Sequence, residues 1–419
     1  MARIEPLHTV RYDPAAVGSL EAVLAPPYDV IDPPFRKELA ARSPFNVVEI
    51  DLPEADGGDP YQHAEETFEH WRRQGVLVQE REPAVWALEQ SFRTPDGDLR
   101  TRRGVFARVR VEDYGPGRIR PHERTHPGPK EDRLRLTRAT RANLSPVFSL
   151  FADPEGASQA IVEGLAAGEP WAEARDDEGT DNTLWRIADP SAIAALADAL
   201  GTAELLIADG HHRYETARTY ADEVGGEGPH RYVLMLLCSL ADPGLAVLPT
   251  HRLLTALKDD TAKQQAIREV LTTHFEVEQV EDPTPAPGGP VSFGYMDSFH
   301  RQPYRVTLKD PAAVEGALPD KPDAYRGLDT AVLEALVLEG ALGMSEDDIA
   351  HFRGLGYSKS LDEARASVES GAVDAAFFMR PTPVEQVQAV AAEGESMPPK
   401  STFFFPKVPT GLVFNLLEE

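Results

Sequence analysis

The stretch Leu205–Ala217, LLIADGHHRYETA, constrains the fold of this chain more than any other part of the sequence. Its first four residues, Leu205–Ala208, are all apolar and predict a short buried strand. Arg213–Glu223 predicts a helix, because apolar residues recur from Tyr214 at spacings of three and four. A strand, a tight turn and a helix in this order are typical of α/β domains, whose ligand sites form at the carboxyl ends of their strands.

Polar residues are concentrated at the turn between this strand and this helix. Asp209 stands where a helix cap is expected, so its carboxylate should accept from the amides of His211 or His212. Gly210 lets the backbone approach a ligand closely. The helix N-terminus offers free amides and the positive end of the helix dipole, and His211, His212 and Arg213 add further donors. The turn therefore predicts a site for an anion, with phosphate as the first candidate.

Two alternatives stay open for this turn. One is a capped helix whose histidines bond to neighbouring groups. The other is a metal site, because Asp209, His211 and His212 are all of ligand type. Adjacent residues on a helix point about 100° apart, however, so two such histidines rarely share one ion.

The overall charge disfavours one broad class of partner. The 419 residues carry 69 acidic and 42 basic side chains, and the net charge of -27 repels nucleic-acid backbones. We therefore expect a small-molecule partner and no nucleic acid. No stretch reaches the roughly 18 apolar residues of a membrane helix, and the first residues lack the apolar region of a signal peptide. The one cysteine, Cys238, lies in an apolar run, so a reduced thiol and a cytoplasmic location are expected.

One segment, Arg118–Arg141, has the opposite charge to the rest of the chain. It holds eight basic and three acidic residues, a net charge of 8 − 3 = +5. The basic residues are Arg118, Arg120, Arg124, Lys130, Arg133, Arg135, Arg138 and Arg141. Two explanations are equally open, internal salt bridges to the abundant acids and a pocket for a small polyanion.

The same segment contains the string His122-Glu123-Arg124-Thr125-His126, which matches the HExxH pattern of zinc proteases. That pattern needs a helix, and Pro127 disfavours a helix at His126. We expect instead a loop that presents Glu123 as a general base, with His122 as a second catalytic candidate beside it. The cations expected to hold phosphate oxygens are Arg120, Arg124, Lys130 and Arg133. A salt-bridged surface loop is the alternative.

Two further blocks contain candidate donors. Near the C-terminus, Lys400, Ser401, Thr402 and Lys407 form a compact set, although Pro399 stands where a P-loop needs glycine and rules that motif out. His251 and Arg252, in the block LPTHR after a buried strand, are candidates for the same pocket. Tyr28 and Asp29 in APPYDV are ambiguous between a functional and a structural role.

The remaining pattern predicts a mixed α/β architecture, because short strands alternate with helices along the chain. Asn46–Leu52 alternates apolar and polar residues as a strand does. The stretch 282–290, DPTPAPGGP, reads as a linker. We therefore predict an N-terminal α/β region at 1–155, a region carrying the DGHHR turn at 156–285, and a C-terminal α/β region at 286–419.

Five blocks together resemble the signature blocks of the domain-of-unknown-function family 1015. They run from Pro26 to Lys407 and read APPYDV, RPHERTHPGPKEDR, ADGHHRYETA, LPTHR and MPPKSTFFFPK. The block DGHHR also resembles the phosphate-contacting motif of the ParB/sulfiredoxin-like superfamily, which includes free-serine kinases, sulfiredoxins and CTP-binding ParB proteins. The resemblance implies a nucleotide-binding core of that type, elaborated by additional α/β regions.

By the same resemblance, the residues from Asp209 to Arg213 hold the phosphates of ATP or ADP, with Mg²⁺ as the accompanying ion. His211 is then also a catalytic candidate, and Glu123 is the base toward the acceptor. The implied activity is phosphotransfer to a small hydroxy compound, with free L-serine as the candidate acceptor. Two alternatives stay open, a nucleotide-binding switch without phosphotransfer and a metal-dependent hydrolase that uses the His, Asp and Glu residues.

Overall fold

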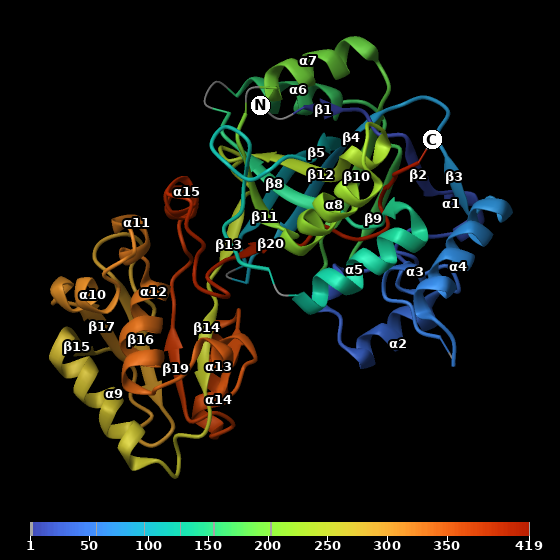
Figure 1. Cartoon of the computed structure of the whole chain (residues 1–419). Helices are drawn as coiled ribbons and strands as arrows, with labels where there is room; N and C mark the ends of the chain where they lie inside the picture. The colour runs from blue at the N-terminus through green and yellow to red at the C-terminus, as the bar shows by residue number, and fades with distance from the viewer. Residues whose placement is uncertain are drawn as a thin grey trace. The chain divides into compact units, whose positions relative to one another are not determined.

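The computed structural model describes residues 3–418 except 56, 96, 126, 154, 155 and 202. Contacts within the chain divide it into two compact units (Figure 1). Unit 1 comprises Met1–Pro121, Thr125–Ala246 and Pro406–Glu419, and unit 2 comprises His122–Arg124 and Val247–Phe405. In the described part of the chain, no helix has the length and apolar character needed to cross a membrane.

These units do not coincide with the three regions expected at 1–155, 156–285 and 286–419. The supposed linker lies inside unit 2, where Arg380 holds it in place. The guanidinium of Arg380 donates to the carbonyls of Ala286, Gly288 and Pro290 and forms an ion pair of 2.6 Å with Asp329. The composition is typical of a linker, but an arginine whose side chain is 9% exposed supplies the hydrogen bonds that fix this segment.

Unit 1 is built on a nine-stranded mixed sheet. Its path runs β6-β11-β8-β12-β5-β4-β10-β9, and β1 pairs with β5. The strands are β1 (Ile4–Glu5), β4 (Val85–Arg93), β5 (Leu99–Arg110), β6 (Ile119–Arg120), β8 (Val147–Phe151), β9 (Ala172–Arg175), β10 (Asp181–Ile187), β11 (Leu205–Asp209) and β12 (Tyr232–Ser239). Strand β12 runs parallel to β8 and antiparallel to β5, and every residue along it is buried. It is therefore the centre of the unit 1 core.

A smaller four-stranded sheet of unit 1, β3-β2-β21-β7, combines distant parts of the chain. Its strands are β2 (Thr9–Tyr12), β3 (Leu77–Gln79), β7 (Ala142–Asn143) and β21 (Phe414–Leu416). The helices of unit 1 are α1 (Pro14–Val17), α2 (Pro33–Arg42), α3 (Val48–Asp51), α4 (Pro60–Gln74), α5 (Pro127–Thr140), α6 (Ala157–Leu165), α7 (Pro190–Leu200) and α8 (His211–Val224), with 3₁₀ turns at Tyr28–Val30 and Pro229–Arg231. Helices α5 and α8 pack against each other, so the basic segment borders the helix of the DGHHR turn.

The strand predicted at Asn46–Leu52 is wrong, because these residues form the short helix α3. The Asn46 side chain accepts from the amide of Val48 at 3.1 Å, and its own amide group donates to the carbonyls of Ala22 and Leu24. Local hydrogen bonds of an asparagine therefore override the alternating pattern.

Unit 2 has a six-stranded sheet in the order β15-β17-β16-β19-β14-β18, in which every pairing is antiparallel. Its strands are β14 (His251–Leu254), β15 (Phe275–Gln279), β16 (Ser292–Asp297), β17 (Tyr304–Leu308), β18 (Leu355–Ser358) and β19 (Ala375–Phe378); β13 (Ala246–Leu248) and β20 (Phe403–Phe405) pair separately. The helices are α9 (Thr261–His274), α10 (Pro311–Ala317), α11 (Asp323–Arg326), α12 (Asp329–Leu333), α13 (Glu346–Ala350), α14 (Leu361–Ser370) and α15 (Val384–Ala392). A π-helical stretch, η3 (Glu334–Ala341), continues α12.

The predicted mixed class of secondary structure is confirmed, since helices and strands alternate along both units. In unit 1 the predicted strand–turn–helix is also present. Strand β11 is paired on both sides, parallel to β6 and antiparallel to β8, and leads directly into α8. The polar turn therefore lies at the carboxyl end of an interior strand.

Candidate functional site

The turn between β11 and α8 depends on Gly210. This residue caps α8 in a left-handed conformation with φ of 93°. A Cβ at this position would lie 2.9 Å from Nε of Arg213. Glycine is therefore required both for the backbone angle and for the space that the arginine side chain occupies.

Asp209 does not cap the helix as predicted. Its Oδ1 lies 2.5 Å from Nζ of Lys407, and its Oδ2 lies 2.5 Å from Nη2 of Arg213. Burial alone would raise the pKa of Asp209, but the charges of Lys407 and Arg213 outweigh it and hold the pKa well below the ordinary value. The prediction failed because two buried cations compete with the backbone amides for one carboxylate, and charged donors bind it more strongly.

This cluster has an excess of positive charge. Lys407 and Arg213 share the single carboxylate of Asp209, and the three side chains are between 8% and 15% exposed. The cap residue of α8, Gly210, has no side chain that could bond to the amides of the helix N-terminus. The positive end of the helix dipole thus adds to one surplus positive charge, and this arrangement favours an anion.

Lys407 reaches the cluster because unit 1 holds the backbone on which it stands. The fully buried guanidinium of Arg102 donates to the carbonyl of Pro406 at 2.8 Å, and Gln90 donates to that of Lys407 at 3.4 Å. Burial lowers the pKa of Arg102 to about 10, so its side chain still carries a positive charge at neutral pH.

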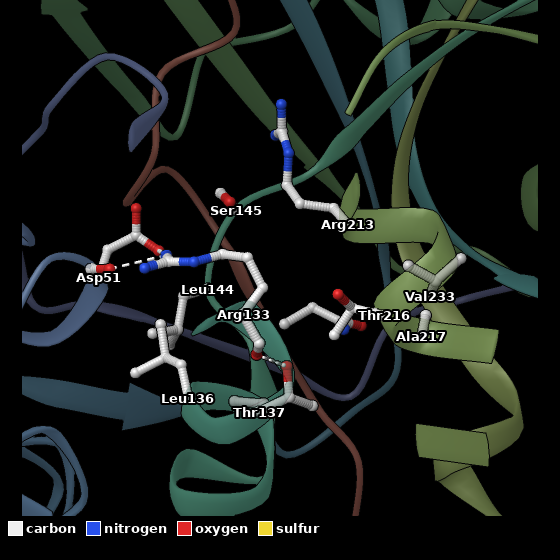
Figure 2. A pocket seen from close by; sticks show the side chains of 12 residues that line it. Asp51, Arg133, Leu136, Thr137, Leu144, Ser145, Arg213, Thr216, Ala217 and Val233 are labelled. Carbon is white, nitrogen blue, oxygen red and sulfur yellow. Dashed lines mark hydrogen bonds and ion pairs between the residues drawn. The ribbon is translucent and has the colours of Figure 1, made fainter. Parts of the chain in front are cut away.

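A small cavity of about 30 Å³ adjoins the cluster (Figure 2). Figure 2 shows Arg133 extended toward Asp51, while Arg213 and Thr216 come from α8. A space of this size is large enough for a water molecule and too small for a nucleotide. The cavity joins the start of α8 to an ion pair of the basic segment, because Arg213 and Arg133 both line it.

The ion pair at this cavity has the opposite charge balance to the Asp209 cluster. Nη1 of Arg133 donates to the carbonyl of Asp51 at 2.7 Å and to its Oδ1 at 3.1 Å, while Asp132 binds the same guanidinium at 2.7 Å. Burial raises the pKa of Asp51, although Arg133 and Arg213 act against the rise. Two carboxylates on one buried cation leave a negative surplus beside the positive one.

Sequence reasoning left Tyr28 ambiguous and missed Asp51. The guanidinium of Arg133 lies over the Tyr28 ring at 4.3 Å from its centroid, and burial raises the pKa of Tyr28 to about 12. The block APPYDV therefore belongs to this site. The signal for Asp51 was an acidic residue at the end of the mainly apolar run NVVEID, where a buried charge needs a partner.

The sequence left two explanations for the basic segment Arg118–Arg141, namely internal salt bridges and a pocket for a polyanion. The contacts of its other residues favour the first. Besides Arg133, four of its residues form ion pairs with acids of unit 1. These pairs are Arg120–Glu204 at 3.1 Å, Arg135–Asp59 at 3.5 Å, Arg138–Glu223 at 2.6 Å and Arg141–Glu65 at 3.0 Å. Internal salt bridging is confirmed for these residues. Lys130 is half-buried on α5, and Arg118 is exposed.

The residues of the HExxH string lie in unit 2 as far as Arg124. Residues 122–125 are not helical, and helix α5 begins only at Pro127. His122 is fully buried and its Nε2 lies 3.0 Å from Oγ1 of Thr402, while Glu123 is half-buried and Arg124 is exposed. His126 lies outside the described residues. Among the residues that are described, no group of three or more His, Cys, Asp or Glu side chains is arranged to hold a metal ion.

The structure divides the C-terminal donor set between the two units. Lys400, Ser401 and Thr402 belong to unit 2, and Lys407 belongs to unit 1, because the division falls between Phe405 and Pro406. Oγ of Ser401 donates to Oγ1 of Thr330 at 3.0 Å, and Lys400 is exposed with φ of 55°. Strand β20 separates the two parts of this block.

The sequence-predicted site residues thus form two groups. Unit 1 brings together Asp209, Gly210, His211, Arg213 and Arg133, with His212 half-buried on the first turn of α8 and Arg120 and Lys130 elsewhere in the unit. Unit 2 holds His122, Glu123, Arg124, His251, Arg252, Lys400, Ser401 and Thr402. The three catalytic candidates are divided, with His211 in unit 1 and His122 and Glu123 in unit 2. Their joint role stays a prediction.

Several solved structures resemble the chain weakly. A conserved hypothetical protein from Pyrococcus furiosus is 16% identical, with a TM-score of 0.36 over 74% of this chain and 95% of that chain. A free serine kinase in complex with AMP is 14% identical, with a TM-score of 0.36 over 74% and 92%. SbnI from Staphylococcus aureus, with a C-terminal truncation, is 10% identical, with a TM-score of 0.37 over 73% and 85%. TM-scores this low transfer neither a fold nor a function.

No protein with a curated description matches the chain. Residues 4–331, however, match the family described as "Protein of unknown function (DUF1015)". The match covers more than half of the chain and includes the APPYDV, DGHHR and LPTHR blocks. This protein belongs to the DUF1015 family.

Proposed function

We propose that this protein is a nucleotide-dependent phosphotransferase that holds the phosphates of ATP or ADP at the start of α8. One observation carries the proposal: Lys407 and Arg213 share the single carboxylate of Asp209 beside a helix N-terminus. Phosphoryl transfer needs little covalent chemistry from a protein and depends mainly on cations and amides that hold charged oxygens in place. The cluster supplies both kinds of donor.

Asp209 is a positioning residue in this proposal. Its carboxylate fixes Nζ of Lys407 and the guanidinium of Arg213 at 2.5 Å each, so both cations are oriented before a ligand arrives. Preorganised donors cost no rearrangement when the phosphate binds. Mg²⁺, when bound with the nucleotide, neutralises phosphate charge and needs only one or two protein carboxylates. Asp132 is a carboxylate of unit 1 that would fit this requirement.

The proposed acceptor is a small hydroxy compound, with free L-serine as the candidate and O-phosphoserine as the product. A carboxylate has to position the acceptor hydroxyl. The sequence nominates Glu123 for this role. The geometry of unit 1 nominates Asp51, which lies across the cavity from α8 and whose pKa is raised by burial.

The direct test incubates the protein with L-serine, Mg²⁺ and either ATP or ADP, and detects O-phosphoserine by mass spectrometry. We expect product with at least one nucleotide. Lys407→Met should lower kcat/KM at least about 100-fold, because it removes a cation that is proposed to contact phosphate. Lys258→Met, which changes an exposed lysine of unit 2, is the matched control and should leave the rate unchanged.

The two base candidates are separated by Glu123→Gln and Asp51→Asn, assayed in the same way after a check of thermal unfolding. The true base variant should lose kcat at unchanged nucleotide affinity. Absence of phosphoserine with both nucleotides would overturn the serine-kinase proposal. Nucleotide binding would be measured by calorimetry, and phosphate transfer would be assayed with a panel of hydroxy compounds. If nucleotide binds but no compound receives a phosphate, the phosphotransferase proposal as a whole is overturned.

A further inference from the structure

Unit 2 contains a polar cluster that the proposed function does not use. Thr250, His251 and Arg252 lie at the start of β14, and they are 7%, 1% and 3% exposed. Strand β14 is interior, paired with β18 on one side and β19 on the other. Polar side chains at such a position lower stability unless their hydrogen-bonding groups find partners.

Arg252 has a buried charge without a carboxylate partner. Its guanidinium donates to the carbonyl of Thr250 at 2.5 Å and to that of Pro399 at 3.3 Å, and it lies over the ring of Tyr357. Within the described residues, no acidic group lies within the 4.0 Å of an ion pair. The hydroxyl of Thr250, beside this guanidinium, is also buried without a hydrogen-bond partner among them.

The acidic group that acts on Arg252 is Glu334, which belongs to the same unit. Each side chain shifts the other's pKa by its charge, yet the two charged groups do not form an ion pair. Burial is the main influence on Glu334 and raises its pKa to about 7. Glu334 is the first residue of the π-helical stretch η3, a local widening that is frequent at functional sites.

The face of the strand agrees with this pairing. Arg252 stands opposite Tyr357 and Phe377 in the sheet, and Phe377 belongs to the same hydrophobic cluster as Leu333 and Leu336 of the α12–η3 segment. His251 points to the other face, where its ring contacts Phe378. Arg252 therefore faces the helical layer on which Glu334 stands.

We propose that Arg252 and Glu334 are the two ends of a binding site for the zwitterion of a small α-amino acid. Arg252, helped by the Thr250 hydroxyl, takes the carboxylate, and Glu334 takes the ammonium group. Arg252 is buried and Glu334 is half-buried, and the two do not form an ion pair. Such charges gain most from a ligand that presents both opposite charges at once. A lone phosphate or a lone amine satisfies only one of them. The site does not depend on phosphotransfer.

The test is calorimetric titration of the full-length protein without nucleotide. The probes are L-serine, L-alanine, glycolate and ethanolamine. We expect both amino acids to bind. Glycolate lacks the ammonium group and ethanolamine lacks the carboxylate, so each should bind at least 10-fold more weakly. No binding of either amino acid, or binding of glycolate or ethanolamine as tight as theirs, would overturn the proposal.

A variant pair makes the role of Glu334 specific. Glu334→Gln should weaken L-serine at least 10-fold and leave glycolate unchanged, because glycolate has no ammonium group to lose. Glu315→Gln, at an exposed position on α10 of the same unit, is the matched control and should change neither affinity. An equal loss for both ligands in Glu334→Gln would mean a structural role and would overturn the assignment.

Proton release gives a readout that folding effects do not imitate. Binding of an ammonium group lowers the pKa of Glu334, so L-serine binding near pH 7 should release a fraction of a proton, detected by repeating the titration in buffers of different ionisation enthalpy. The release should vanish in Glu334→Gln. If phosphoserine forms but neither the titrations nor the proton release detect amino-acid binding at Glu334, only this inference is overturned. If the amino acids bind as expected but no phosphoserine forms, only the phosphotransferase proposal is overturned.

Discussion

The buried charges of the two units are arranged differently. In unit 1, Asp209 contacts two cations, and Arg133 contacts two carboxylates. In unit 2, Arg252 and Glu334 influence each other without contact. Ions in contact fix each other's side chains and leave only a small net charge that a ligand can neutralise. Ions that are not in contact leave both charges available to a ligand. The first arrangement suits a phosphate, and the second suits a zwitterion.

The largest effect is expected from breaking the contacts in unit 1. Asp209→Asn removes the charge that holds Lys407 and Arg213 together, and we expect a loss of about 3–5 kcal/mol in the free energy of unfolding. Urea denaturation monitored by circular dichroism measures it. Asp222→Asn, at an exposed position on the same helix, should change stability little. A loss below about 1 kcal/mol in Asp209→Asn would mean that the cluster is not preorganised.

The second effect concerns the pH dependence that Glu334 gives unit 2. Its folded pKa of about 7 lies above the ordinary 4.5, so between these values the folded state retains a proton that the unfolded state has released. Stability should therefore fall as pH rises from 4.5 to 7, by roughly 3 kcal/mol at most. Glu334→Gln should remove this dependence, measured as denaturation midpoints at pH 5 and pH 8. If stability depended on pH in the same way in the variant and in the unchanged protein, the raised pKa of Glu334 would be contradicted.

A third, smaller effect tests the turn itself. Gly210→Ala places a Cβ at φ of 93° and within 2.9 Å of Arg213, and should cost about 1–3 kcal/mol of stability. Thermal unfolding measures the cost, and nucleotide affinity should fall with it because Arg213 has to move. Gly115→Ala is the control, since its Cβ would meet no atom within 4 Å. Equal stability of the two variants would show that the turn tolerates a side chain.

A feature of the fold or of the candidate site could be predicted from the sequence when the residues that cause it are neighbours in the chain. The strand, turn and helix around Gly210 follow from neighbouring residues, and the prediction is confirmed. The role of Asp209 depends on Lys407, which is 198 positions away in the sequence, so no local rule reveals that it binds cations instead of capping α8. Likewise, the composition of residues 282–290 is typical of a linker, but hydrogen bonds from the distant Arg380 hold this segment in place.

The smallest expected effect comes from the exposed pairs of the basic segment. Arg138→Ala removes the 2.6 Å contact to Glu223, which joins α5 to α8 at the surface. Such pairs contribute about 0–1 kcal/mol, so the denaturation midpoint should shift only slightly. Added salt should reduce even this shift. A loss as large as that of Asp209→Asn would remove the distinction between buried and exposed ion pairs in unit 1.

The return of residues 406–419 to unit 1 has a consequence for how the protein is made. Strand β21 lies between β2 and β7, and Lys407 completes the Asp209 cluster, yet both are translated after all of Val247–Phe405. At about 5–20 residues per second, synthesis of unit 2 takes on the order of 10–30 s. During that time the ribosome-bound chain carries Asp209 and Arg213 without their lysine. The nascent protein therefore gains its complete cation cluster only after Val247–Phe405 has been synthesised.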